Sequence, residues 1–176
     1  NPSDPSPVLR SLLVRLGQWV RHEDLPPPNN IPRLKDGTLT RHADLALRPD
    51  IAAPPRPNCI SSVSDNGNER PKPCTRGTSA TSPVLVPQQN PAGNEIAGIH
   101  LPQTDLSLGT YTGWNIYDAP FAHHILCDRA GAYFPLQDKS NVSRDDIRES
   151  LVVLAGQGFV LDDEIEELTE EIFAKA

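Results

Sequence analysis

The residues best suited to holding a metal lie in the stretch HHILCD. It brings His123, His124, Cys127 and Asp128 together within six positions, 123–128. Adjacent histidines point in different directions in either regular structure, and the stretch lacks the second ligand pair that a closed tetrahedral zinc site requires. The sequence therefore predicts no metal site, and a metal-binding protein is kept as a third interpretation.

No stretch of the chain has the spacing of a self-contained catalytic site. The sequence contains no Gly-x-Ser-x-Gly nucleophile elbow, no His-Glu-x-x-His zinc motif and no glycine-lysine phosphate loop. Five histidines are available as bases, but none has a nucleophile at an assignable spacing. We therefore assign no catalytic residue and expect no cofactor.

The cysteines leave two interpretations open. Cys59 and Cys74 flank a polar loop, and a disulfide between them would close a ring that has little else to order it. Such a ring contributes about 3 kcal/mol when the effect is treated as chain entropy. The alternative is that Cys59 and Cys74 are two ordinary loop thiols that form no disulfide. A bridge favours a secreted or periplasmic protein, and without one the compartment stays open.

The composition argues against an independent core. The 176 residues include 19 prolines, with 37% hydrophobic and 5% aromatic residues, and proline adds no ladder hydrogen bonds. The net charge of -7 is spread along the chain without a basic stripe, so we expect no nucleic-acid partner. No apolar run approaches the ~20 residues of a membrane span. The absence of methionine leads us to expect a processed or excised piece.

Periodicity predicts helices at both ends of the chain. The first covers 7–21 with Ser6 as its cap, and its apolar stripe is too wide to face water: Val8, Leu9, Leu12, Leu13, Leu16, Trp19 and Val20. A second helix begins near Arg144 after the cap Ser143 and is stopped by Gly156 and Gly158. Asp162 is expected to cap a third.

The middle of the chain is predicted to be mostly extended. Prolines favour an extended arm followed by an exposed loop, with a turn at Asp36-Gly37. Val84 to Val86 and Ile96 to Ile99 predict two strands, or one strand and a turn. The expected divisions are 1–22 for the first helix, 23–81 for the arm and loop, 82–142 for the strand and turn region, and 143–176 for the last helices.

Five stretches together resemble a known family: VLRSLLVRLGQWV, PPPNNIPRLKDGTLT, LVPQQNPAGNEIAGIHLP, LGTYTGWN and LCDRAGAYFPL. In order and rough spacing they are similar to the C-terminal end of a group of large, esterase-like bacterial α/β-hydrolase domain proteins. Departures fall at Asn90-Pro91, at His100 and in the loop bearing Cys59 and Cys74. The resemblance implies an α/β fold class, in which this chain is the C-terminal part of an α/β-hydrolase fold and not an independent domain. Its first helix would pack on a parallel sheet, the proline-rich arm would wrap that body, and two C-terminal helices would close it.

The resemblance also implies a serine hydrolase of carboxylic esters or related acyl bonds. Its nucleophile, acid and histidine would lie upstream of these residues, so this chain alone is expected to be inactive. The expected partners are the remainder of the hydrolase and a small-molecule ester. The alternative is a non-catalytic interaction module that docks through the first helix and the arm.

The aromatic stretch LGTYTGWNIYD, residues 108–118, is the candidate for contact with that ester. Two glycines among polar residues predict a tight turn that presents Tyr111 and Trp114 to the acyl or alcohol pocket. The predicted substrate-binding residues are Tyr111, Thr112, Trp114 and Asn115. The alternative is a core plug, in which Trp114 and Tyr117 fill the space between the arm and the hydrolase body.

Overall fold

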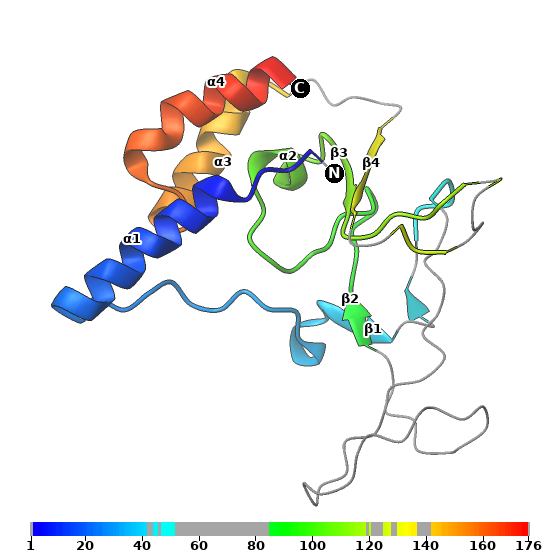
Figure 1. Ribbon diagram of the computed structural model, residues 1–176, viewed down its shortest axis with the longest axis horizontal. Helices are drawn as coiled ribbons and strands as arrows, with labels where there is room; N and C mark the ends of the chain where they lie inside the picture. Colours follow the sequence, from blue (N-terminus) through cyan, green and yellow to red (C-terminus); the bar gives the residue numbers. More distant parts are fainter. Residues whose placement is uncertain are drawn as a thin grey trace, which may run out of the picture.

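The chain folds as a helical group beside a set of short strands and turns (Figure 1). The structure, a computed structural model, describes residues 2–41, 44–45, 47–51, 85–118, 120, 125–127, 130–136 and 142–175. Its helices and 3-10 turns are α1 Ser6–His22, η1 Leu34–Asp36, α2 Pro102–Asp105, α3 Arg144–Gly156, η3 Asp162–Glu164 and α4 Ile165–Lys175. Its strands are β1 Leu39–Arg41, β2 Leu85–Pro87, β3 Gly109–Thr112 and β4 Ala132–Pro135.

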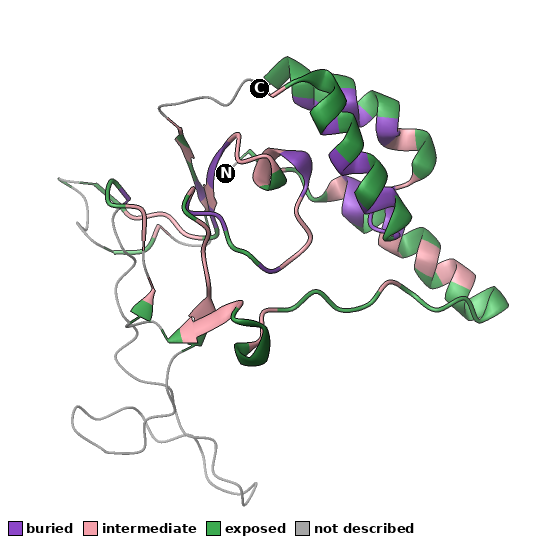
Figure 2. Cartoon of the chain, turned by 180° about the vertical axis from the view of Figure 1, so that it is seen from behind, coloured by how far each residue is buried: buried purple, intermediate pink, exposed green. Residues whose placement is uncertain are grey.

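The packed core lies between α3 and α4. Ile147, Leu151 and Leu154 recur on one face of α3, and Ile165, Leu168 and Ile172 recur on the facing side of α4. These are the i, i+3, i+4 and i+7 positions that a helix turns to one side, and Figure 2 shows buried segments along both C-terminal helices. The two C-terminal helices predicted from the sequence are confirmed.

Both ends of α3 are set by local chemistry. Ser143 and Asp146 form a reciprocal capping box, in which Asp146 N–H donates to Ser143 Oγ at 3.1 Å and Ser143 N–H donates to the Asp146 carboxylate at 2.8 Å. At the other end Gly158 has a φ of +85°, Gly158 N–H donates to Ala155 O and Phe159 N–H donates to Leu154 O. These two bonds make a Schellman motif, so the predicted stop at the glycines has a physical cause.

Two predicted caps are wrong. Ser6 is itself inside α1, and its N–H and hydroxyl both donate to the Asp4 carboxylate, at 2.9 and 2.6 Å. A charged acceptor two residues earlier has therefore replaced the serine hydroxyl at the helix start. Asp162 likewise lies inside η3, whose cap position is Leu161 with no side-chain hydrogen bond.

Only the beginning of α1 packs on the helical core. Val8 joins the buried cluster with Leu12 packed against it. The buried Ser11 hydroxyl donates to Gly158 O at 2.9 Å, and Arg10 Nε lies 2.6 Å from Glu164 Oε1. Figure 1 shows the rest of α1 running away from α3 and α4.

Along its length α1 also presents an apolar surface to solvent. Leu9, Leu13, Leu16 and Val20 are 60%, 69%, 48% and 76% exposed, and their spacing places them along one side of the helix. We call these four residues the open face of α1. Within the described part of the chain, no helix is both long and apolar enough to cross a membrane.

Each observed sheet is a two-stranded antiparallel ribbon. β1 pairs with β2, matching Thr40 to Val86, and β3 pairs with β4, matching Tyr111 to Tyr133. Of the two alternatives expected for 84–86 and 96–99, one strand and a turn is what forms: β2 is the strand, and the isolated bridge between Gln89 and Glu95 closes the turn at 91–92. The described residues contain no parallel sheet, so packing of α1 on one remains a prediction.

The arm between α1 and β1 is extended and held at a few points. Asn30 donates from its side-chain amide to Gly98 O, and the turn predicted at Asp36-Gly37 is confirmed by a Gly37 φ of +67°. We expected an extended segment before that turn, but the 3-10 turn η1 forms there instead. Cys59 and Cys74 lie outside the described residues, as do most positions of the predicted loop.

The two glycines at the end of α3 give a paired stability test. Gly158→Ala is expected to lower the free energy of unfolding by about 1–2 kcal/mol, because alanine is strained in the left-handed region. Gly156→Ala is expected to raise it by about 0.5 kcal/mol, because Gly156 is helical with open space around its Cα. Urea unfolding of the natively produced protein measures both, and equal effects of the same sign would contradict this assignment of the helix end.

Candidate functional site

A pair of tyrosines marks the hairpin of β3 and β4 as a candidate site. Tyr111 and Tyr133 are directly opposite in the register, and their ring centroids are 5.1 Å apart with the planes tilted by 49°. Gly109 makes room for this pair, because a Cβ there would lie 2.3 Å from the Tyr133 ring. The glycine before Tyr111 is therefore needed for the close approach of an aromatic ring from the partner strand.

Asn94 holds the other edge of β3. Its side-chain amide donates to Gly109 O at 2.8 Å, and its Oδ1 accepts the Tyr111 N–H at 2.8 Å. Asn94 is fully buried. Because the C=O of one strand residue and the N–H two residues later point to the same side, one amide satisfies both, as a neighbouring strand would. The position of Tyr111 thus depends on a side chain seventeen residues earlier in the sequence.

The turn that carries Asn94 is closed by its own hydrogen bonds and packs on Thr110. Asn94 N–H donates to Asn90 Oδ1 at 3.0 Å, and Gly93 has a φ of +83°. A Cβ on Gly93 would lie 2.8 Å from Thr110 Cγ2. The Thr110 hydroxyl donates to Ala92 O and accepts from Arg48 Nη1 at 2.8 Å. The GNEIAGI and GTYT stretches of the sequence therefore meet in space.

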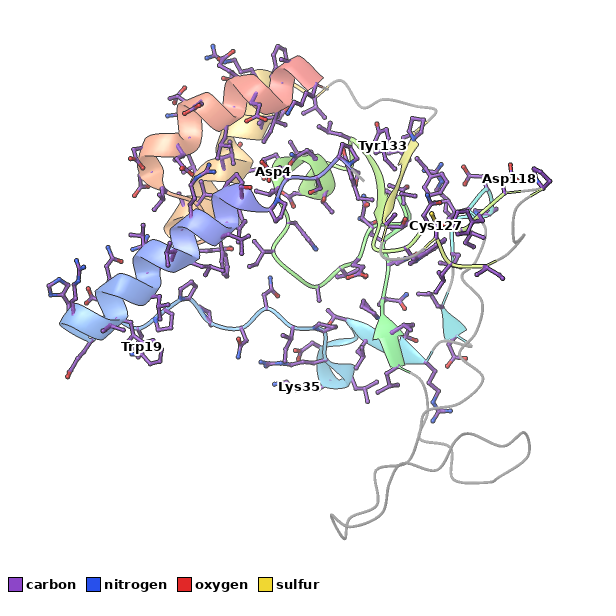
Figure 3. All side chains as sticks on the ribbon, viewed as in Figure 1. Asp4, Trp19, Lys35, Asp118, Cys127 and Tyr133 are labelled. Atoms are coloured by element: carbon purple, nitrogen blue, oxygen red, sulfur yellow. The ribbon has the colours of Figure 1, made fainter. Side chains whose placement is uncertain are left out.

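A cavity of about 250 Å³ opens beside the tyrosine pair. Its apolar wall includes Leu101 and Leu108 near β3, and Leu168 and Ile172 from α4. Its remaining boundary comes from Pro2 to Asp4, Pro7, Gln103, Glu171 and Lys175, together with Tyr111 and Tyr133 themselves. Figure 3 labels Asp4 and Tyr133, which mark the N-terminal segment and the β4 strand on two sides of it.

Burial changes the acidity of Tyr111. Removal from water disfavours the phenolate and raises the pKa of Tyr111 to about 12, with a smaller contribution from Tyr133. At neutral pH the Tyr111 side chain is consequently a neutral hydroxyl-bearing ring. It offers the cavity an aromatic surface and no charge.

The four predicted substrate-binding residues are placed differently. Tyr111 lines the cavity, and it lies on a strand and not in the turn that we predicted. The Thr112 hydroxyl is buried, donates to Trp114 O at 2.5 Å and accepts from Ala132 N–H at 3.1 Å. Asn115 Oδ1 accepts the Ile116 N–H at 2.8 Å, and Trp114 is partly exposed. Contact of any of the four with substrate remains a prediction.

Three contributors to this site escaped the sequence reasoning. The sequence alone indicated no role for Asn94 beyond membership of a stretch that resembles the family. An asparagine that follows a glycine in a turn is nevertheless a signal for backbone hydrogen bonding. Tyr133 is a single aromatic in a short strand, and Gln103 carries no motif. The roles of Asn94 and Tyr133 come from contacts across 15 or more residues, which residue spacing along one element does not reveal.

A second hollow, of about 170 Å³, contains a serine, an aspartate and a histidine but no catalytic relay. Ser150 Oγ donates directly to Asp105 at 2.8 Å. His100 Nε2 lies 3.2 Å from Ala97 O, and a carbonyl only accepts, so this nitrogen carries the proton in that contact. A serine triad needs a histidine nitrogen that accepts the serine proton. The Ser150–Asp105 bond instead joins α3 to α2.

The remaining chemical candidates are only partly described. Cys127 is a free thiol of intermediate burial, and its N–H donates to Asn115 O at 2.8 Å. His123, His124 and Asp128 lie outside the described residues, as do Cys59 and Cys74. Neither the absence of a metal site nor the disulfide is therefore tested by the structure.

Helices combined with short strands define a mixed chain of α and β structure. Residues 1–149 match the protein family described as "Alpha/beta hydrolase domain". The match covers well over half of the chain, which therefore belongs to this alpha/beta hydrolase family, as the resemblance predicted. No curated protein and no solved structure matches the chain.

Removing the Asn94 side chain is expected to destabilise the hairpin. Asn94→Ala leaves Gly109 O and Tyr111 N–H without these partners, at a cost of about 2–4 kcal/mol in the free energy of unfolding. Asn29→Ala is the matched control, since Asn29 is exposed, and it should change stability by less than about 0.5 kcal/mol. Chemical unfolding of the natively produced protein compares the two, and an equal effect of both substitutions would contradict the clamp.

The raised pKa of Tyr111 predicts a loss of stability at high pH. The ordinary value is 10.0 and the folded value about 12, so the folded state retains the phenol proton that the unfolded state loses. The stability from this neutral ring is complete below pH 10.0 and disappears as pH rises to about 12. Tyr111→Phe should lessen that decline.

Phenolate absorbance provides the direct measurement. The titration of the native protein minus that of the Tyr111→Phe variant should have its midpoint near 12. A Tyr133→Phe background should lower this midpoint only slightly, because burial is the larger cause of the shift. A difference midpoint near 10.0 would show that Tyr111 is not shielded from water.

Proposed function

We propose that this chain is the C-terminal part of an α/β-hydrolase that cleaves carboxylic esters or related acyl bonds. The proposed mechanism uses a serine, a histidine and an acid that lie outside these residues. The observation that carries the proposal is the open face of α1, in a chain that belongs to a hydrolase family and whose sequence contains no nucleophile elbow.

The open face needs a partner surface. Burial of a leucine or valine side chain is worth roughly 1.5–3 kcal/mol, and Leu9, Leu13, Leu16 and Val20 leave most of that unrealised. The adjacent side of α1 already packs through Val8 and Leu12. An apolar stripe wider than one packed neighbour can cover is typical of a helix that contacts two elements, and in an α/β-hydrolase the second would be the sheet of the main body.

The arm between α1 and β1 also exposes apolar side chains that need a partner surface. Leu25, Ile31 and Leu34 are 84%, 58% and 61% exposed along a segment that makes few hydrogen bonds. An extended, proline-containing segment of this kind suits a course over the surface of a folded body. The same face and arm would serve the alternative, a non-catalytic module docked on an unrelated protein.

The proposed reaction proceeds in two balanced steps. The serine oxygen attacks the ester carbonyl while its proton passes to the histidine, and the C–O bond then breaks as the histidine returns that proton to the leaving alcohol. Water, deprotonated by the same histidine, then attacks the acyl carbon. The bond between that carbon and the serine oxygen breaks as the histidine returns the proton to the serine oxygen, which releases the carboxylic acid and regenerates the serine. This chain would complete the fold and contribute a wall of the pocket through Tyr111.

A serine-directed fluorophosphonate probe combined with intact mass spectrometry tests the proposal. The natively purified protein should contain a probe-labelled polypeptide, either continuous with this chain or co-purifying with it. The separately expressed 176 residues should take no probe and should lack a cooperative melt, because their apolar face is uncovered. Masses under non-reducing and reducing conditions also show whether Cys59 and Cys74 are bonded.

Two results would contradict this proposal. A lone unlabelled chain with a cooperative melt would reject the hydrolase assembly and favour the interaction module. A paired substitution tests the face itself: Leu13→Asp should strongly reduce labelling or assembly despite the 69% exposure of Leu13, while Val152→Asp, at 43% exposure on α3, should leave both nearly unchanged. Equal effects would show that the open face of α1 has no partner.

A further inference from the structure

The geometry points to a small-molecule site in the cavity beside Tyr111 and Tyr133. We propose that this cavity binds a neutral, largely aromatic molecule bearing one hydroxyl group. The cavity is lined by residues of this chain, and binding there does not depend on the hydrolase mechanism.

The size and walls of the cavity set the bulk of the ligand. Its volume is about 250 Å³, and Leu101, Leu108, Leu168 and Ile172 supply apolar surface. An apolar cavity of about 150 Å³ can hold benzene, so this one admits a ligand of roughly ten non-hydrogen atoms by simple proportion. A fused two-ring aromatic molecule has that size.

The tyrosine pair favours an aromatic ligand over an aliphatic one. The two rings line the same cavity, with centroids 5.1 Å apart and planes tilted by 49°. Tilted rings present both an electron-rich face and an electropositive edge to a third ring, and aromatic contacts of either kind add to the gain from burial alone. Asn94 and Gly109 hold this arrangement in place through the β3 backbone.

The side chain of Gln103 is the reason for proposing a hydroxyl group on the ligand. Gln103 lines the cavity, and its Oε1 is buried with no hydrogen-bond partner. A buried amide oxygen without a donor is costly, and the terminal torsion of glutamine is soft enough to turn the amide toward the cavity. A hydroxyl is suited to this contact because it can donate to Oε1 or accept from Nε2, whichever faces it.

The charges around the cavity favour a neutral ligand. Lys175 Nζ is already paired with Glu171 Oε1 at 2.6 Å. Asp4 adds a second carboxylate, whose pKa is lowered chiefly by the two hydrogen bonds from Ser6 and to a smaller extent by the charges of Arg10 and Lys175. An anionic ligand would meet this net negative boundary without a free cation to pair with among the lining residues.

Three related compounds test each part of the proposal by calorimetric or fluorescence titration of the natively produced protein near neutral pH. 2-Naphthol is expected to bind, naphthalene to bind roughly fivefold more weakly for lack of one hydrogen bond, and 2-naphthoate to bind more weakly than naphthalene. Failure of 2-naphthol to bind would overturn the site. Equal binding of 2-naphthoate and 2-naphthol would overturn the selection for a neutral ligand.

Substitutions locate the binding. Gln103→Leu should reduce the affinity for 2-naphthol about fivefold and leave naphthalene almost unchanged. The control is Gln157→Leu, which makes the same change at an exposed position away from this cavity. If Gln103→Leu bound 2-naphthol with unaltered affinity, the hydroxyl of the ligand would not be hydrogen-bonded to the Gln103 amide. That result would overturn the hydroxyl assignment.

A cavity-filling variant provides the second check. Leu108→Trp adds bulk from a lining residue that is only partly buried and should abolish binding of all three compounds. Far-ultraviolet circular dichroism and the unfolding midpoint verify that the variant is folded, and Gln103→Leu stands as the test if it is not. Undiminished binding by a folded Leu108→Trp protein would place the compounds elsewhere. Fluorophosphonate labelling of the same samples reports the proposed hydrolase separately.

Discussion

The arrangement of the candidate site depends on one buried amide. Asn94 bonds both Gly109 O and Tyr111 N–H, so it replaces the neighbouring strand that β3 lacks on that side. In a chain with few apolar residues in its middle section, hydrogen bonds must fix what packing does not. Fixing β3 also fixes β4 through the ladder, and with it the opposed tyrosines. The hairpin is thus positioned in large part from its edge.

The helical part is stabilised in a different way, and a few contacts join the two. The α3 and α4 pair buries a continuous apolar cluster, to which Leu101 from the segment before α2 also belongs. Ser150 on α3 donates to Asp105 on α2, and α2 is followed within four residues by β3. The cavity lies at this junction, because rings from the hairpin and aliphatic side chains from α4 meet there without filling the space.

The sequence predicted those features whose cause is local. The cap at Ser143, the stop at Gly156 and Gly158 and the stripes of α3 and α4 depend on residues within two turns of one another. The cap of α1 was misassigned because two competing oxygens, on Asp4 and Ser6, lie two residues apart. The role of Asn94 was missed because its partners are 15 and 17 residues away, where no periodicity applies.

The two sides of α1 connect the fold to the family assignment. One side is committed: Val8 and Leu12 pack on the helical core, and the Ser11 hydroxyl reaches Gly158 O. The adjacent side carries four apolar residues that are between 48% and 76% exposed. An apolar stripe of this width exceeds what one packed neighbour covers, whereas a helix that contacts both an outer helical layer and a sheet can bury all of it. The width of this stripe is therefore intelligible if the helical pair is the outer layer of a hydrolase body, with α1 between the two.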